Sequence, residues 1–204
     1  MDKFILELPG FVPESVCNSV IEAFCKKEDL IKPGMLTYMV SDKLCSSEKP
    51  NKEMFLEHYP EFKELSHCID QYLNECIKVY LRHLNLDFDI NNKKYHHPFA
   101  EILTSNVKKL KKAVHQIKRG KKYEWHVDSY PGNRAGDVPF LQFILYLNTL
   151  EPGQGGKTKF INGRKVRPEV GKIVIFPRSW TFPHCGKKVK ADYKYIIAGG
   201  VEIS

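Results

Sequence analysis

The residues with the greatest capacity for chemistry lie in the run Tyr123-Glu124-Trp125-His126-Val127-Asp128. Residues two apart on a strand point to the same side, so His126 and Asp128 would present an imidazole and a carboxylate to one point. A second imidazole from elsewhere would complete a site of two histidines and one carboxylate. That set holds Fe(II) on one face and leaves other coordination positions open. Alone, the His-x-Asp pair is a weak motif, because any strand can carry it by chance.

Motifs further along the chain give this pair its context. Gly120 and Tyr123 precede it. Three motifs follow it: a Gly-Gly-x-Thr-x-Phe segment, a Pro-x-x-Gly-x-x-x-x-Phe run and a His-x-Gly motif. A lysine lies ten residues beyond the last histidine. The later motifs comprise Gly155, Gly156, Thr158, Phe160, Pro168, Gly171, Phe176, His184, Gly186 and Lys194. In order and spacing, the sequence resembles the 2-oxoglutarate-dependent dioxygenases of the prolyl 4-hydroxylase type over residues 116–200, about half of the chain.

The resemblance implies a double-stranded β-helix that holds Fe(II) on His126, Asp128 and His184. It also implies that O2 and 2-oxoglutarate are consumed, that succinate and CO2 are released, and that ascorbate serves as a reductant. Members of the family that halogenate lack the carboxylate, which leaves space for a halide. The presence of Asp128 therefore favours hydroxylation of a substrate C–H bond.

The same resemblance assigns cosubstrate contacts to Lys194, Thr158 and Tyr123. Lys194 would pair with the distal carboxylate of 2-oxoglutarate, Thr158 would hydrogen-bond the cosubstrate, and Tyr123 would line the pocket. Strand alternation puts Lys194 on one face with Ile196 and Ala198, in a run apolar enough for a core strand. A lysine usually points to solvent from an edge strand, but a buried ammonium requires an acid, which the cosubstrate would supply.

The sequence departs from the family pattern at two positions, which bear on the substrate. Ile117 stands where the family often has a tyrosine, and Gly200 where it often has a tryptophan. A prolyl residue in a peptide or protein is the first expectation for the substrate. A free amino acid, another small molecule or a nucleobase is the alternative. A non-catalytic jelly-roll binding module is the alternative from another class, and retention of all three ligands with Lys194 argues against it.

Periodicity predicts helices first and strands afterwards. One helix should run from Pro13 to about Lys27, and another should follow Pro60 with an apolar stripe from Phe62 to Leu84. Residues 30–50 look irregular, with a turn at Pro33-Gly34 and a polar loop from Ser41 to Pro50. The predicted strands are 99–104, 113–117, 123–130, 140–147, 158–161, 172–176 and 193–203, separated by Gly- and Pro-containing turns.

These elements predict an α+β fold. A double-stranded β-helix, which is a jelly-roll of the cupin-like kind, would occupy residues of about 95–204, and a helical part of about 1–90 would buttress it. We find no repeat, low-complexity tract or linker, so residues 1–204 are expected to form a single domain. The nine residues from Pro131 to Pro139 are long enough for a mobile lid.

Composition narrows the function classes. No stretch is apolar enough for a membrane span, no secretory signal is evident, and the six cysteines form no framework, so a cytoplasmic location is expected. The formal net charge of +8 fits nucleic acid or an acidic protein substrate. Basic residues spread along the chain, with their densest cluster at 108–112, favour an ordinary solvated surface instead.

Several other patterns are set aside. The run Gly153 to Thr158 resembles part of a phosphate-binding loop, but it lacks the first glycine and leads into a strand. His96 and His97 are adjacent, so on an extended chain they face opposite ways. His115 is expected to be a satisfied core or edge histidine. Cys185 is expected to be a small packed residue, because no base is evident for it.

Overall fold

The computed structural model describes residues 1–31, 33–40, 43–84, 107–109, 112–128 and 138–203. Within these residues the strands form two antiparallel sheets. The larger sheet has the order β1 (Leu6–Leu8), β10 (Ile173–Pro177), β7 (Val138–Tyr146), β12 (Tyr193–Ile203), β5 (Ala113–Lys118), β3 (Lys43–Met54) and β2 (Pro33–Val40), and β4 (Val107–Lys109) also pairs with β12. The smaller sheet has the order β6 (Tyr123–His126), β11 (His184–Gly186), β8 (Thr158–Phe160) and β9 (Lys165–Val166).

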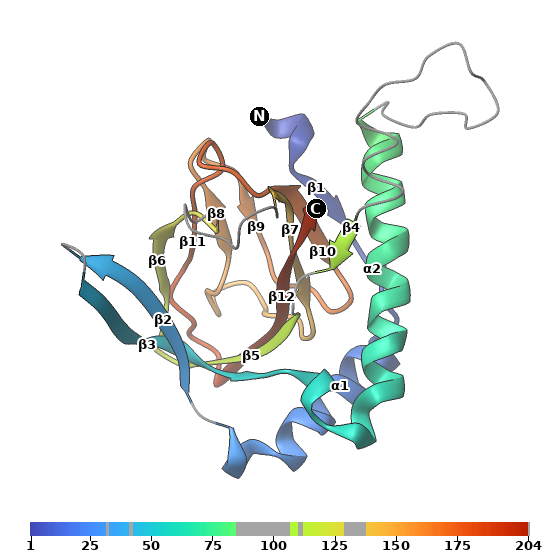
Figure 1. The fold of residues 1–204 in the computed structure, drawn as a ribbon, viewed down its shortest axis with the longest axis vertical. Helices are drawn as coiled ribbons and strands as arrows, with labels where there is room; N and C mark the ends of the chain where they lie inside the picture. The colour runs from blue at the N-terminus through green and yellow to red at the C-terminus, as the bar shows by residue number, and fades with distance from the viewer. Residues whose placement is uncertain (32, 41–42, 85–106, 110–111, 129–137, 204) are drawn as a thin grey trace.

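Two α-helices cover the larger sheet, as the periodicity predicts. They are α1 (Glu14–Lys26), which follows Pro13, and α2 (Lys63–His83), which follows the short 3-10 turn η4 (Pro60–Phe62). The remaining 3-10 turns are η1 (Asp2–Phe4), η2 (Glu28–Leu30) and η3 (Leu56–His58). Figure 1 shows α2 lying along one side of the strands, with the β2–β3 hairpin extending on the other side. None of the helices in the described part of the chain is both long and apolar enough to cross a bilayer.

The alternation of side chains along β7 explains the layers. Leu141, Phe143 and Leu145 point outward and pack with residues of α1 and α2, including Phe24 and Leu73. Their neighbours along the strand point the other way, into a second core between the two sheets. That inner core comprises Ile144, Tyr146, Val174, Phe176, Ile196, Phe160, Val166 and Phe182, among others. Because both faces of the central strands are buried, these strands are continuously apolar.

Two facing antiparallel sheets with helices on one outer face form a double-stranded β-helix, which confirms the predicted fold class. The strands predicted at 113–117, 140–147, 158–161, 172–176 and 193–203 are present with small shifts at their ends. Of the strand predicted at 123–130, β6 accounts for the first half. The predicted strand 99–104, the pair His96 and His97, and residues 131–137 of the proposed lid lie outside the described residues.

The prediction of an irregular stretch over residues 30–50 is wrong. These residues form β2 and most of β3, an antiparallel hairpin joined to the sheet through Lys52, which pairs with Gln116 of β5. β2 forms the end of the sheet, where a strand needs no continuous apolar face. Composition therefore does not reveal the pairing. The short strands β1, β4 and β11 also exist only through pairing with distant segments.

The cluster at 108–112 is predicted to be a solvated turn or edge. In the structure, Lys108 and Lys109 belong to β4. Lys112 is buried, and its Nζ lies 3.0 Å from an Asp70 carboxylate oxygen of α2. The expectation is therefore wrong for Lys112, because its charge is paired with Asp70, a residue of α2 far from it in the sequence.

Candidate functional site

Three candidate metal ligands meet on neighbouring strands of the smaller sheet. His126 ends β6, Asp128 follows two residues later, and His184 begins β11, where the register pairs it with His126. One ligand atom from each residue lies within 4.8 Å of the others. The Nε2 atoms of His126 and His184 lie 3.9 Å and 3.4 Å from the Asp128 carboxylate oxygens. The fold thus gathers the three residues that the resemblance names.

Both imidazole rings are oriented by the backbone. Nδ1 of His126 lies 2.8 Å from the carbonyl oxygen of Glu124, and Nδ1 of His184 lies 3.3 Å from that of Phe182. A carbonyl oxygen can only accept, so each Nδ1 carries the hydrogen in the neutral ring and each Nε2 keeps its lone pair. Holding the outer ring nitrogen in this way fixes the tautomer and aims Nε2 of a metal-binding histidine.

The Asp128 carboxylate completes a set of atoms suited to a cation. Its Oδ2 atom is buried, yet no hydrogen-bond partner for it is found among the described residues. The two Nε2 lone pairs face the same carboxylate. A buried acceptor without a partner costs about 1–3 kcal/mol, more when it is charged. These donors fit a divalent ion such as Fe(II), which takes imidazole and carboxylate ligands together.

The electrostatics at His184 favour the protonation state that a metal requires. Burial lowers the pKa of His184; the Asp128 charge raises it less than burial lowers it, and the charges of His126 and Lys194 lower it further. The neutral imidazole is therefore favoured, and only the neutral form can coordinate a metal.

Arg178 binds the backbone of Asp128. Its Nε donates to the backbone carbonyl of Asp128 at 2.9 Å, and its Nη1 donates to Glu202 Oε1 at 3.1 Å. Both side chains of the ion pair are largely buried, at 15% and 11% exposed, so water screens it little. The guanidinium therefore joins the end of β12 to the residue that carries the carboxylate. Sequence reasoning missed this contact, since neither residue belongs to a recognisable motif.

A buried cation lies further inside, between the two sheets. Lys194 of β12 is 4% exposed, and its Nζ donates to the carbonyl of Gly156 at 2.8 Å and lies 5.1 Å from the Tyr146 ring. Within the described residues it forms no ion pair with an acid. Burial lowers the pKa of Lys194 to about 7. A buried ammonium with only neutral partners fits the carboxylate of a bound ligand.

Tyr146 and Gly156 contact Lys194, and Thr158 contacts Tyr146. The Tyr146 hydroxyl lies 2.7 Å from Thr158 Oγ1, and both side chains are buried. Gly156 has φ +67°, and a Cβ there would lie 2.5 Å from Leu150 Cδ1 and 3.4 Å from Lys194 Cδ. The position therefore requires glycine. Tyr146 was missed from sequence because it lies in an apolar strand, where an aromatic residue is typical of core packing.

Tyr123 packs beside the ligands and belongs to a polar network. Its ring centroid lies 5.9 Å from that of His126, and its hydroxyl donates to Asn51 Oδ1 and contacts His115 Nδ1. His115 Nε2 lies 3.0 Å from Glu53 Oε1. Burial raises the pKa of Glu53, but His115 and Lys49 outweigh that effect and lower it to about 2. His115 is thus a buried, satisfied histidine, as expected, and Cys185 is buried too.

Comparison with known proteins relates this site to a family of enzymes. Residues 113–200, which hold both histidines, Asp128 and Lys194, match the model of the 2OG-Fe(II) oxygenase superfamily. Over these 88 residues, out of 204 in the chain, the sequence is similar to the 2OG-Fe(II) oxygenases. A search of curated protein sequences finds no match. The site residues fit the family's Fe(II) and 2-oxoglutarate, because the donor set suits the metal and the buried lysine suits the distal carboxylate.

Solved structures with a similar fold include prolyl hydroxylases. A viral collagen prolyl hydroxylase from Paramecium bursaria Chlorella virus-1, in complex with 2-oxoglutarate, has a TM-score of 0.64 and 17% identity over 98% of this chain and 96% of that one. The Pseudomonas putida prolyl-4-hydroxylase has a TM-score of 0.66 and 16% identity over 98% and 93%. A Trichoplax adhaerens prolyl hydroxylase is bound to a peptide fragment of the hypoxia inducible factor oxygen degradation domain. It has a TM-score of 0.64 and 17% identity over 98% of this chain and 83% of that one. At these identities the likeness shows the fold.

Proposed function

We propose that this chain is a 2OG-Fe(II) oxygenase that hydroxylates a prolyl residue in a peptide or protein, converting 2-oxoglutarate to succinate and CO2. Two observations carry the proposal. The two imidazoles converge on a buried Asp128 oxygen that has no hydrogen-bond partner among the described residues, and the same fold buries a lysine that no acid of the described residues pairs with. The similar structures support the substrate class, because they are prolyl hydroxylases and one holds a peptide.

In this proposal His126, Asp128 and His184 hold Fe(II), and Arg178 keeps Asp128 in place. Lys194 receives the distal carboxylate of 2-oxoglutarate, with Thr158 beside it. When bound, the metal and the cosubstrate supply the oxidising chemistry, and ascorbate is the expected reductant. The carboxylate ligand supports hydroxylation, because it occupies the position that a halide would need.

The tyrosine Tyr123 is the least direct of the proposed cosubstrate contacts. Its hydroxyl is already engaged by Asn51 and His115, and its ring lies against His126. We therefore propose that Tyr123 forms one wall of the pocket, and that its contribution is the shape of the ring rather than a free hydroxyl.

Succinate formation tests the proposal. Full-length protein with Fe(II), 2-oxoglutarate and ascorbate is incubated with proline-containing peptides, free proline, nucleosides and oligonucleotides, and succinate is measured with and without a chelator. Chelator-sensitive succinate that rises most with peptides, together with a mass gain of one oxygen on proline, is the expected result. Stimulation by free proline or nucleosides alone would replace the peptide substrate with a small molecule or nucleobase. Absence of any metal-dependent turnover would refute the activity itself.

A further inference from the structure

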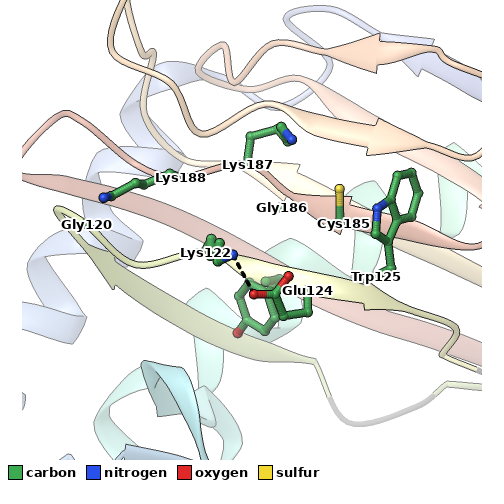
Figure 2. Close-up of a pocket in the computed structure, with 9 residues that line it drawn as sticks. Gly120, Lys122, Glu124, Trp125, Cys185, Gly186, Lys187 and Lys188 are labelled. Atoms are coloured by element: carbon green, nitrogen blue, oxygen red, sulfur yellow. Dashed lines mark ion pairs between the residues drawn. The ribbon is translucent and has the colours of Figure 1, made fainter.

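The face of the smaller sheet opposite the metal ligands carries a concentration of positive charge. Along β6, Glu124 and Trp125 are exposed, whereas Tyr123 and His126 are half-buried with ring centroids 5.9 Å apart, because the register against β11 shifts between them. A hollow of about 360 Å³ on this side is lined by Trp125, by Lys122, Lys187 and Lys188, and by one carboxylate, that of Glu124, among others. In Figure 2, Lys187 and Lys188 rise on one side of the hollow and Lys122 on the other, while Trp125 stands beside Cys185.

Three segments that are distant in sequence build this face, which we term the basic face: residues 119–122, 157–165 and 187–190. Together they hold ten lysines and arginines and no aspartate or glutamate. Backbone hydrogen bonds join them: Lys187 N to Lys157 O at 2.8 Å, and Val189 N to Lys121 O at 2.9 Å. Although the basic residues are spread along the sequence, backbone pairing brings about a third of them together in these segments.

Few of these charges are neutralised locally. Glu124 pairs with Lys122, Asp192 with Arg119, and Glu7 with Arg164. The remaining lysines have no ion pair within the described residues: Lys121, Lys157, Lys159, Lys165, Lys187, Lys188 and Lys190. Lys159 of β8 even pairs in register with Lys165 of β9. Like charges set opposite one another destabilise a sheet, so stability does not explain this arrangement.

An exposed aromatic ring lies within the same face. Trp125 is 47% exposed, and Lys159 Nζ lies 5.7 Å from its ring. Lysines around an exposed aromatic ring match a chain of phosphates that carries flat bases, since bases stack on aromatic side chains without regard to sequence. An acidic peptide would neutralise the lysines equally well but would leave the tryptophan ring to water.

We propose that the basic face binds single-stranded nucleic acid, with the lysines on phosphates and Trp125 as a platform on which a base stacks. This surface lies on the other side of the sheet from the metal ligands. The proposal does not depend on the proposed prolyl hydroxylation, because binding is measured without turnover.

Fluorescence anisotropy with labelled single-stranded oligonucleotides of about 12 nucleotides tests binding. The full-length protein is used with Mn(II) in place of Fe(II), and the titration is repeated over a range of salt. Each lysine–phosphate contact adds about 0.7 to the slope of log K against log salt. Lys157→Glu/Lys187→Glu/Lys188→Glu should lower the affinity at least about tenfold and reduce that slope by about 2. The matched control Lys26→Glu/Lys63→Glu/Lys78→Glu, on α1 and α2, changes the net charge equally and should bind far more tightly than the first triple variant.

Trp125 separates nucleic acid from any other polyanion. The chain has two tryptophans, so in a Trp180→Phe background the emission comes from Trp125, and a stacked base should quench it. Trp125→Ala should weaken binding about 5- to 150-fold with the salt slope unchanged, and Trp125→Phe should restore most of the affinity. Circular dichroism checks that each variant is folded.

Three results would overturn the proposal. The first is no binding at low salt. The second is equal weakening by the two triple variants, which would mean that net charge alone attracts the oligonucleotide. The third is displacement by polyglutamate as effectively as by unlabelled oligonucleotide, with Trp125→Ala unchanged, which would assign the face to an acidic protein.

Discussion

The Nε2 atom of His184 lies 3.4 Å from the Oδ2 atom of Asp128, and no hydrogen bond joins them. His184 keeps its hydrogen on Nδ1, facing the carbonyl of Phe182, so two electron pairs face each other at short range. Such a contact is repulsive unless a cation lies between them. The relationship indicates metal binding without reference to any related protein.

The first prediction concerns these ligands. His126→Ala, Asp128→Ala and His184→Ala should each weaken Mn(II) or Fe(II) binding by more than the roughly 10- to 100-fold that loss of an outer partner costs. Isothermal titration or Mn(II) electron spin resonance measures the affinity. His58→Ala, at an exposed histidine, is the control and should bind normally. Wild-type affinity in all three variants would place any bound metal elsewhere.

The second prediction concerns Arg178. Because its guanidinium holds the Asp128 carbonyl and the buried Glu202, Arg178→Ala should lower metal affinity about 10- to 100-fold. Arg178→Lys should recover little, since an ammonium cannot reproduce the two-directional fork. Arg167→Ala, at a more exposed arginine paired with Glu169, is the matched control. If metal affinity is unchanged while unfolding is easier, Arg178 serves stability alone.

The third prediction concerns Lys194 and the cosubstrate. Lys194→Ala should cost about 2–5 kcal/mol of 2-oxoglutarate binding, because the carboxylate loses its buried charge partner, while metal binding survives. Lys194→Arg should recover only part, since the planar fork needs different room beside Gly156. Calorimetric titration with 2-oxoglutarate in the presence of Mn(II) measures both. An unchanged affinity in Lys194→Ala would remove this residue from the cosubstrate site.

The fourth prediction is a pH dependence of cosubstrate binding. Burial lowers the pKa of Lys194 to about 7 from 10.5, so the ammonium is fully present below pH 7 and is lost in the cosubstrate-free protein as the pH rises through about 7. Affinity for 2-oxoglutarate should therefore fall above about pH 7, by up to tenfold per unit. Titrations across this range check it, with Lys194→Met as the control that should lose the dependence. A flat wild-type profile would contradict the lowered pKa.

Stability should change in the opposite sense, which gives the fifth prediction. In the unfolded chain Lys194 keeps its proton up to about pH 10.5. Between about pH 7 and pH 10.5 the unfolded chain therefore binds more protons than the folded protein. The free energy of unfolding without cosubstrate should therefore gain a contribution from Lys194 that rises with pH in this window. Lys194→Met should have a Tm a few degrees higher at pH 7, since it removes the burial of a charge. A lower Tm would indicate that the ammonium is stabilised by contacts stronger than those of Gly156 and Tyr146.

Sequence alone was sufficient for the features that depend on short spacing. The two-residue step from His126 to Asp128 places both side chains on one side wherever the segment is a strand, and helical spacing predicted α1 and α2. Alternation along β12 likewise predicted that Lys194 shares a face with Ile196, and in the structure both are buried between the sheets. These results follow from local backbone geometry, which neighbouring residues determine.

Only the tertiary structure decided the contacts between distant segments. Arg178 reaches Asp128 and Glu202 across 50 and 24 residues, and the β2–β3 hairpin joins the larger sheet through the pairing of β3 with β5. The basic face arises because strand pairing brings together three lysine-rich segments that look unremarkable one at a time. Charge and hydrogen bonding act between any groups that come within a few ångströms, and the order of residues along a chain does not specify which distant groups those will be.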